Sequence, residues 1–130
     1  MPEISKIGTM SLIENIKDLK YFPTGSEGDI APLLFGGNLT SHAMSIPPGF
    51  YPPHSHPMEL LLICVKGSCD IFQGDGKLRG KMGPMSVALI PENEEIGQEI
   101  HGLGPCELIV VVAPKKMSRE EFIARFEKND

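Results

Sequence analysis

Short apolar runs separated by glycine and proline are the feature that most limits what this sequence can fold into. The chain of 130 residues contains 14 Gly and 12 Pro, with no internal repeat and no low-complexity tract. Glycine and proline favour turns, so several short apolar runs between them are typical of an all-β sandwich or barrel. We therefore predict an all-β fold with strands over 31–35, 39–46, 60–65, 68–73, 78–82, 86–90, 96–100 and 106–112.

The two ends of the chain have different patterns. Residues 4–22 are compatible with a short helix or an edge strand, and 23–29 reads as a loop in either case. Near the other end, Ser118 followed by Glu121 forms a capping box, and apolar residues then recur at helical spacing. This pattern predicts a short C-terminal helix over about 118–128, which we expect to pack on the outside of the β core without a catalytic role.

Length and composition limit the number of domains and the class of partner. A chain of 130 residues is long enough for one well-buried core and too short for two. The net charge is −5 and no cluster of Lys and Arg is present, which argues against nucleic-acid or anionic-membrane partners. We find no signal-peptide pattern and no run of the roughly 20 apolar residues that span a membrane. We expect one domain over 1–130, with an N-terminal arm at 1–29 and a barrel core at 30–113, in the cytoplasm.

Three cysteines, Cys64, Cys69 and Cys106, are an odd number in a chain of this type. This number favours reduced thiols over a disulfide framework. If Lys66 and Gly67 form a two-residue hairpin turn, Cys64 faces Cys69 directly across the strand pair. We interpret these two thiols mainly as small buried apolar side chains, with a redox or metal role as the alternative.

The residues with most chemical information lie between Gly49 and Gly67. His54 and His56 are two positions apart after a proline-rich lead-in, so on an extended chain they point to the same face. Two imidazoles on one face can be offered to one metal ion. A third imidazole, His42, shares a face of strand 39–46 with Thr40, Met44 and Ile46.

Many short strands with glycine and proline corners, together with His-x-His before an apolar strand, resemble the cupin superfamily over residues 30 to 113. The resemblance implies a jelly-roll (cupin-type) β-barrel with a metal-centred pocket in its mouth. The first cupin motif is Gly, five residues, His-x-His, three or four residues, Glu, six residues, Gly. It is matched with shifts by Gly49, His54, His56, Glu59 and Gly67.

The carboxylate of this motif departs from the pattern. Glu59 comes one position early, and Leu60 stands where the shorter family spacing puts the glutamate. On a regular strand Glu59 points away from the pocket, whereas a bulge near Pro57 returns it to the inner face. Both alternatives remain open from the sequence.

The second cupin motif also departs from the pattern. It is matched best by the segment that begins at Pro91, where Ile96 replaces the third histidine and Ile100 replaces the asparagine. Two imidazoles alone hold a divalent ion weakly. If Zn, Fe, Mn or Ni is bound, the further ligand candidates are Glu59, His42, Gln98 and His101.

The resemblance also implies a pocket for a small molecule, which we expect to be largely apolar with Tyr51 and Glu59 at its rim. The expected lining is Met44, Tyr51, Met58, Leu60, Leu62, Ile96 and Gln98. Two functions stay open: a non-catalytic binding barrel, and a metal-dependent enzyme of isomerase, dioxygenase or lyase type acting on a small oxygenated substrate. Barrels of this family often form pairs, so the resemblance implies a homodimer. A protein whose main role is dimerisation is therefore a third possible function.

Overall fold

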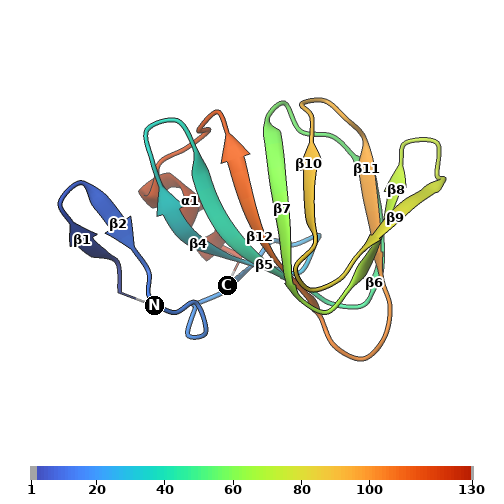
Figure 1. The fold of residues 1–130 in the computed structure, drawn as a ribbon, viewed down its shortest axis with the longest axis horizontal. Coiled ribbons are helices and arrows are strands. Elements are labelled where there is room, and N and C mark those ends of the chain that lie inside the picture. The colour runs from blue at the N-terminus through green and yellow to red at the C-terminus, as the bar shows by residue number, and fades with distance from the viewer. Residues whose placement is uncertain (1–2, 130) are drawn as a thin grey trace.

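The computed structural model describes residues 3–129, and Figure 1 shows them as a barrel of antiparallel strands with one helix at its side. The strands are β1 (Ser5–Ile7), β2 (Met10–Leu12), β3 (Phe22–Pro23), β4 (Asp29–Phe35), β5 (Thr40–Ile46), β6 (Gly49–His54), β7 (Glu59–Lys66), β8 (Cys69–Gln73), β9 (Leu78–Met82), β10 (Val87–Ile90), β11 (Ile96–Ile100) and β12 (Cys106–Ala113). The helix is α1 (Arg119–Glu127). No helix of residues 3–129 is long and apolar enough to cross a membrane.

Two antiparallel sheets form the walls of the barrel. The larger sheet has the order β10-β7-β12-β5-β4-β3, and the smaller has the order β6-β11-β8-β9. From β5 onward the chain passes repeatedly from one sheet to the other, remaining within one sheet only for the β8 and β9 pair. This alternation is the connectivity of a jelly roll, so the predicted all-β jelly-roll class is confirmed.

The connection after β7 differs from the predicted hairpin. β7 pairs with β10 and β12, whereas β8 lies in the other sheet beside β9 and β11. Cys64 therefore stands opposite Leu108 of β12 and not opposite Cys69. The prediction of a two-residue turn was wrong because a glycine corner and a tight hairpin have the same local sequence.

Gly67 shows why this corner requires glycine. Its φ of +78° lies in the left-handed region, and a Cβ atom added there would stand 2.5 Å from the carbonyl oxygen of Pro105. Any other residue would meet both the backbone strain and the collision. Gly67 thus brings the end of β7 close to the start of β12.

The core lies between the two sheets and follows the period of two along the strands. In β12, alternate residues are buried and the residues between them are partly exposed. One buried cluster combines side chains of the larger sheet, such as Leu62 and Leu108, with Met82 and Ile100 of the smaller one. A second buried cluster lies between the helix and the larger sheet, where Phe122 of α1 packs with Phe22 and Ile30.

β7 is covered on one face only, although its nearly unbroken apolar run predicts cover on both. Leu60, Leu62 and Cys64 are buried, whereas Val65 is 43% exposed on the other face. The neighbouring strand continues this outer surface with Val87 and Leu89. The continuous apolar run therefore located the strand correctly but overestimated its burial.

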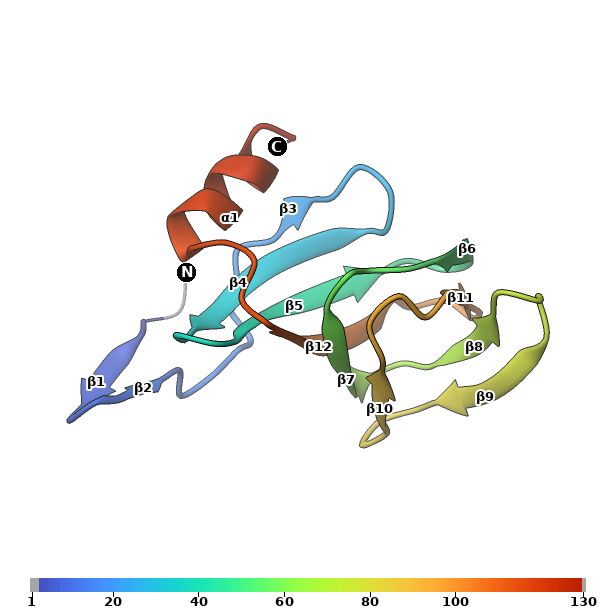
Figure 2. The same cartoon turned by 90° about the horizontal axis from the view of Figure 1, so that it is seen from above.

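The structure shows which elements form at the two ends of the chain. Residues 4–22 contain the short hairpin of β1 and β2 and the beginning of β3, with no helix. At the other end the capping box is confirmed, because Ser118 Oγ accepts a hydrogen bond from the Glu121 backbone and the Glu121 carboxylate accepts one from the Ser118 backbone. Figure 2 shows α1 lying against β3 and β4.

Candidate functional site

A cavity of about 350 Å³ lies inside the barrel and is bounded mainly by apolar side chains. This volume suits a small organic molecule. Strand alternation builds the wall, because every second residue of β5 and β7 points inward. The apolar lining comprises Ile30, Met44, Ile46, Met58, Leu60, Leu62, Ile90, Ile96, Leu108, Val110, Val112, Met117, Phe122 and Phe126.

The structure places six of the seven expected pocket residues on this wall, namely Met44, Met58, Leu60, Leu62, Ile96 and Gln98. Their role in binding stays a prediction. Tyr51 is not part of the lining, and its hydroxyl donates a hydrogen bond to the carbonyl oxygen of Pro47 at 2.8 Å. This hydrogen bond links Tyr51 of β6 to the turn that precedes the strand.

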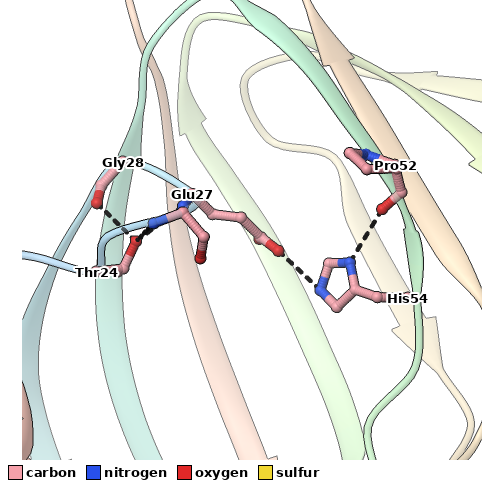
Figure 3. Close-up of polar contacts among 6 residues, drawn as sticks. Thr24, Glu27, Gly28, Pro52 and His54 are labelled. Carbon is pink, nitrogen blue, oxygen red and sulfur yellow. Dashed lines mark hydrogen bonds and ion pairs between the residues drawn. The ribbon is translucent and has the colours of Figure 1, made fainter.

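His54 lies at the mouth between two hydrogen-bond acceptors (Figure 3). Its Nε2 is 2.8 Å from Oε1 of Glu27, and its Nδ1 is 3.2 Å from the carbonyl oxygen of Pro52. A carbonyl and a carboxylate only accept, so both contacts are hydrogen bonds when the ring carries a proton on each nitrogen. Each ring nitrogen of His54 therefore faces an oxygen acceptor of the protein itself.

Glu27 owes its position to the loop between β3 and β4. The hydroxyl of Thr24 accepts hydrogen bonds from the backbone of Ser26 and Glu27, at 3.2 and 2.8 Å, and donates one to the carbonyl oxygen of Gly28 at 2.9 Å (Figure 3). A Cβ atom at Gly28 would collide with the backbone of Ser45. The loop therefore has a defined shape that aims Glu27 at the cavity.

His56 and His42 have surroundings that favour the neutral imidazole. Burial and then the neighbouring His54 lower the pKa of His56, and Glu27 opposes this effect. Burial and, secondarily, His56 lower the pKa of His42 to about 4. His42 is half-buried by surface area, yet it is strongly desolvated because its free edge faces the apolar cavity and not bulk water.

The remaining ligand candidates do not complete a metal site. Glu59 is exposed and outside the lining, as expected for a regular strand without a bulge. His101 lies beyond the far end of β11, where its Nε2 is 3.1 Å from a carboxylate oxygen of Asp70. In the part of the chain that the structure describes, no three His, Cys, Asp or Glu side chains are grouped so that they could hold a metal ion.

The donor set therefore does not fit the divalent metal centre that the sequence resemblance implies. The positions that would supply further ligands hold Leu60 and Ile96, which have no donor atom. His54, one of the two remaining ligands, is paired with Glu27.

Several cavity residues were not among the predicted ones. Glu27 and Glu94 are acidic, Lys116 and Arg125 are basic, and Phe122 projects from α1. We expected the helix to pack on the outside of the β core, but it lies over the cavity-lining face of the larger sheet, where Phe122 contacts His42, and it closes part of the cavity. The capping box indicated the helix, but no local pattern indicates which surface such a helix covers.

The comparisons with known proteins agree on the fold. No protein-family model matches the sequence, and no curated protein matches it. A RmlC-like cupin from Shewanella frigidimarina superposes with a TM-score of 0.65 at 17% identity, over 84% of this chain and 93% of that one. A putative ethanolamine utilization protein, EutQ, from Salmonella typhimurium superposes with a TM-score of 0.71 at 13% identity, over 89% and 98%.

A third structure is the polyketide cyclase RemF from Streptomyces resistomycificus. It has a TM-score of 0.65 at 22% identity, over 88% of this chain and 92% of that one. At these identities the likeness concerns the fold. Together with the sheet order it shows that the chain has the cupin fold, a jelly-roll barrel with an internal cavity.

Proposed function

We propose that this chain binds a largely apolar small molecule inside the barrel, with a polar group of the ligand near the histidines. The observation that carries this proposal is a cavity of about 350 Å³ whose wall is mostly apolar, with three histidines reaching it from β5, β6 and the loop after β6. Sites of this composition are typical for small organic ligands.

Thermal unfolding with a neutral probe tests the proposal. Propylbenzene should raise the unfolding temperature of the wild type, because a ligand that binds only the folded state stabilises it. Leu62→Phe fills part of the cavity and should weaken this effect, while Leu61→Phe, on the outer face of the same strand, should retain it. An equal response of both variants would mean that the probe binds elsewhere.

The second candidate function is an enzyme acting on a small oxygenated substrate. It is favoured by three imidazoles on one cavity, since the neutral rings of His42 and His56 can accept a proton. Two structures with a similar fold are named as a polyketide cyclase and as a DMSP lyase, so the fold is compatible with catalysis.

Metal content separates the metal-dependent form of this candidate from binding alone. Elemental analysis of tag-free wild type should be compared with the double variant His54→Ala and His56→Ala. Stoichiometric Zn, Fe, Mn or Ni in the wild type, absent from the double variant, would support the metal-dependent enzyme. Equal content would support binding without a resident metal.

We also propose a homodimer formed through the outer face of the larger sheet. There Val87 and Leu89 of β10 are 62% and 61% exposed, and they stand opposite Ile63 and Leu61 of β7. Together with Val65 these residues make an apolar outer face. Contiguous apolar surface of this kind is a common feature of protein interfaces.

A further inference from the structure

His42 is a polar residue in an unusual position. It lies in the middle of β5, opposite Val110 of β12 on one side and Pro32 of β4 on the other, and its ring reaches the cavity wall. The inward-facing neighbours on its own strand include Met44 and Ile46. A histidine at this place costs desolvation energy that an apolar residue would not.

The ring of His42 has no hydrogen-bond partner among residues 3–129. Its described ring contact is with Phe122 of α1, at 5.7 Å between centroids and 36° between planes. The ring nitrogens are not sealed off by surrounding protein, so they remain accessible from the cavity. Since a neutral imidazole has one donor and one acceptor, both of its hydrogen-bonding groups can be offered to a molecule in the cavity.

The surroundings of His42 favour an aromatic molecule. Phe122 contacts the ring of His42. The ring of Phe126 lies next to that of Phe122, with 4.9 Å between the two centroids. Both phenylalanines line the cavity together with Met44 and Met117. Aromatic faces and thioethers are good contacts for another aromatic ring.

We propose that the cavity takes an uncharged hydroxyaromatic ligand, a phenol, whose hydroxyl hydrogen-bonds His42 and whose ring packs against Phe122. This inference rests on the proposed binding function and adds the ligand class and the residue that selects it. A hydroxyl can both donate to and accept from the imidazole. A carboxylate hydrogen-bonded to His42 would be buried beside a neutral group and would lose hydration there, and Glu27 and Glu94 on the same wall would repel it, against the attraction of Lys116 and Arg125.

Calorimetric titration with three matched probes tests the inference: 4-propylphenol, propylbenzene and 4-propylbenzoate. In the wild type, 4-propylphenol should bind about tenfold more tightly than propylbenzene, the effect of one hydrogen bond in a desolvated site. 4-Propylbenzoate should bind most weakly. In His42→Leu the advantage of the phenol should disappear, while His42→Gln, which retains a donor and an acceptor, should keep part of it.

Three other results of these titrations would contradict the inference. Equal binding of phenol and propylbenzene in wild type and variants would overturn the role of His42 and leave the proposed binding function intact. Tighter binding of the benzoate would overturn the choice of an uncharged ligand. If no probe binds, both the inference and the proposed function fail for this ligand class.

A measurement on the wild type covers the case in which His42→Leu does not fold. The imidazole carbon-bound protons of His42 should shift in NMR spectra on saturation with 4-propylphenol, and much less with propylbenzene. His101, which lies beyond the far end of β11, is the internal control and should not shift. Equal small shifts of both histidines would contradict the inference.

Discussion

Three histidines reach the same cavity, and their surroundings give them different properties. His54 has an acceptor on each ring nitrogen, Glu27 on one side and the Pro52 carbonyl on the other. His42 has a ring contact with Phe122 and is neutral because burial and, secondarily, the nearby His56 disfavour its charged form. The same residue type is thus a fixed hydrogen-bonded group at the mouth and an unpaired one on the wall.

This contrast predicts how stability depends on pH. The pKa of His42 falls from 6.5 to about 4 on folding, so between these values the unfolded chain binds more protons than the folded one. The stabilisation is complete above pH 6.5 and decreases as the pH falls towards 4. His42 should account for a loss of up to roughly 3 kcal/mol over this range.

Denaturant unfolding of wild type and His42→Gln between pH 4 and pH 8 measures this contribution. His56 acts in the same direction in both proteins, so the difference between their profiles reports His42 together with its electrostatic coupling to His56. The variant should show the flatter profile. Parallel profiles would mean that His42 keeps access to bulk water and that the cavity is not a desolvated site.

At the scale of single elements, α1 contributes three side chains to the cavity wall, of which Phe122 is the most deeply buried. Phe122 is 5% exposed and contacts both Phe35 and His42. Phe122→Ala should lower the free energy of unfolding by about 3 kcal/mol, which is typical for a buried phenylalanine. Phe50→Ala is the control: Phe50 is 57% exposed on β6, so its loss should cost under about 1 kcal/mol. Equal losses in denaturant unfolding would show that the helix contributes little.

The cysteines at the corner after β7 form a buried cluster. Sγ of Cys64 is 3.9 Å from Sγ of Cys106, and all three thiols are free and buried. Burial raises the pKa of Cys64 to about 11, and the hydrogen bond with Cys69 together with burial raises the pKa of Cys106. Both thiols therefore remain protonated at neutral pH.

These thiols should be chemically inert in the folded protein. At pH 8, reaction of Cys64 with Ellman's reagent should be slower than that of an exposed cysteine by about 100-fold, because so little thiolate is present. The reagent should label three thiols after denaturation. Rapid labelling of Cys64 or Cys106 in the native protein would contradict a structural role for these two thiols.

The limits of sequence reasoning differ between elements. The start of α1 follows from the capping box at Ser118, and the inward face of β5 follows from a period of two. The connection after Gly67 does not, because a turn within one sheet and a corner between two sheets use the same residues. Glu27 was missed for a related reason: its contact with His54 joins two segments that are distant in the chain.

At the scale of the whole molecule, two signals were sufficient to predict the cupin fold. They are the glycine and proline residues between short apolar runs and the motif of His54 and His56. These signals are local and are repeated along the chain. The cavity chemistry depends on a loop, two sheets and a helix that meet in space, so the sequence indicated the apolar wall but not the acidic and basic groups around it.

The apolar outer face makes a prediction about assembly. Analytical ultracentrifugation should show a dimer for the wild type and a monomer for the double variant Val87→Lys and Leu89→Glu. Leu78→Glu, on exposed β9 of the other sheet, is the control and should remain dimeric. A wild type that is monomeric at millimolar concentration would contradict the proposed dimer.

The central claim, that the cavity is a binding site for apolar molecules, can be tested with the methionines that the chain already contains. Met44, Met58 and Met117 line the cavity, while Met10 and Met85 are 54% and 90% exposed outside it. We propose NMR of protein labelled with ¹³C at the methionine methyl groups, titrated with propylbenzene. The three cavity methyls should shift and saturate together while those of Met10 and Met85 stay unchanged. Unchanged cavity signals, or equal shifts of all the methyls, would contradict the claim.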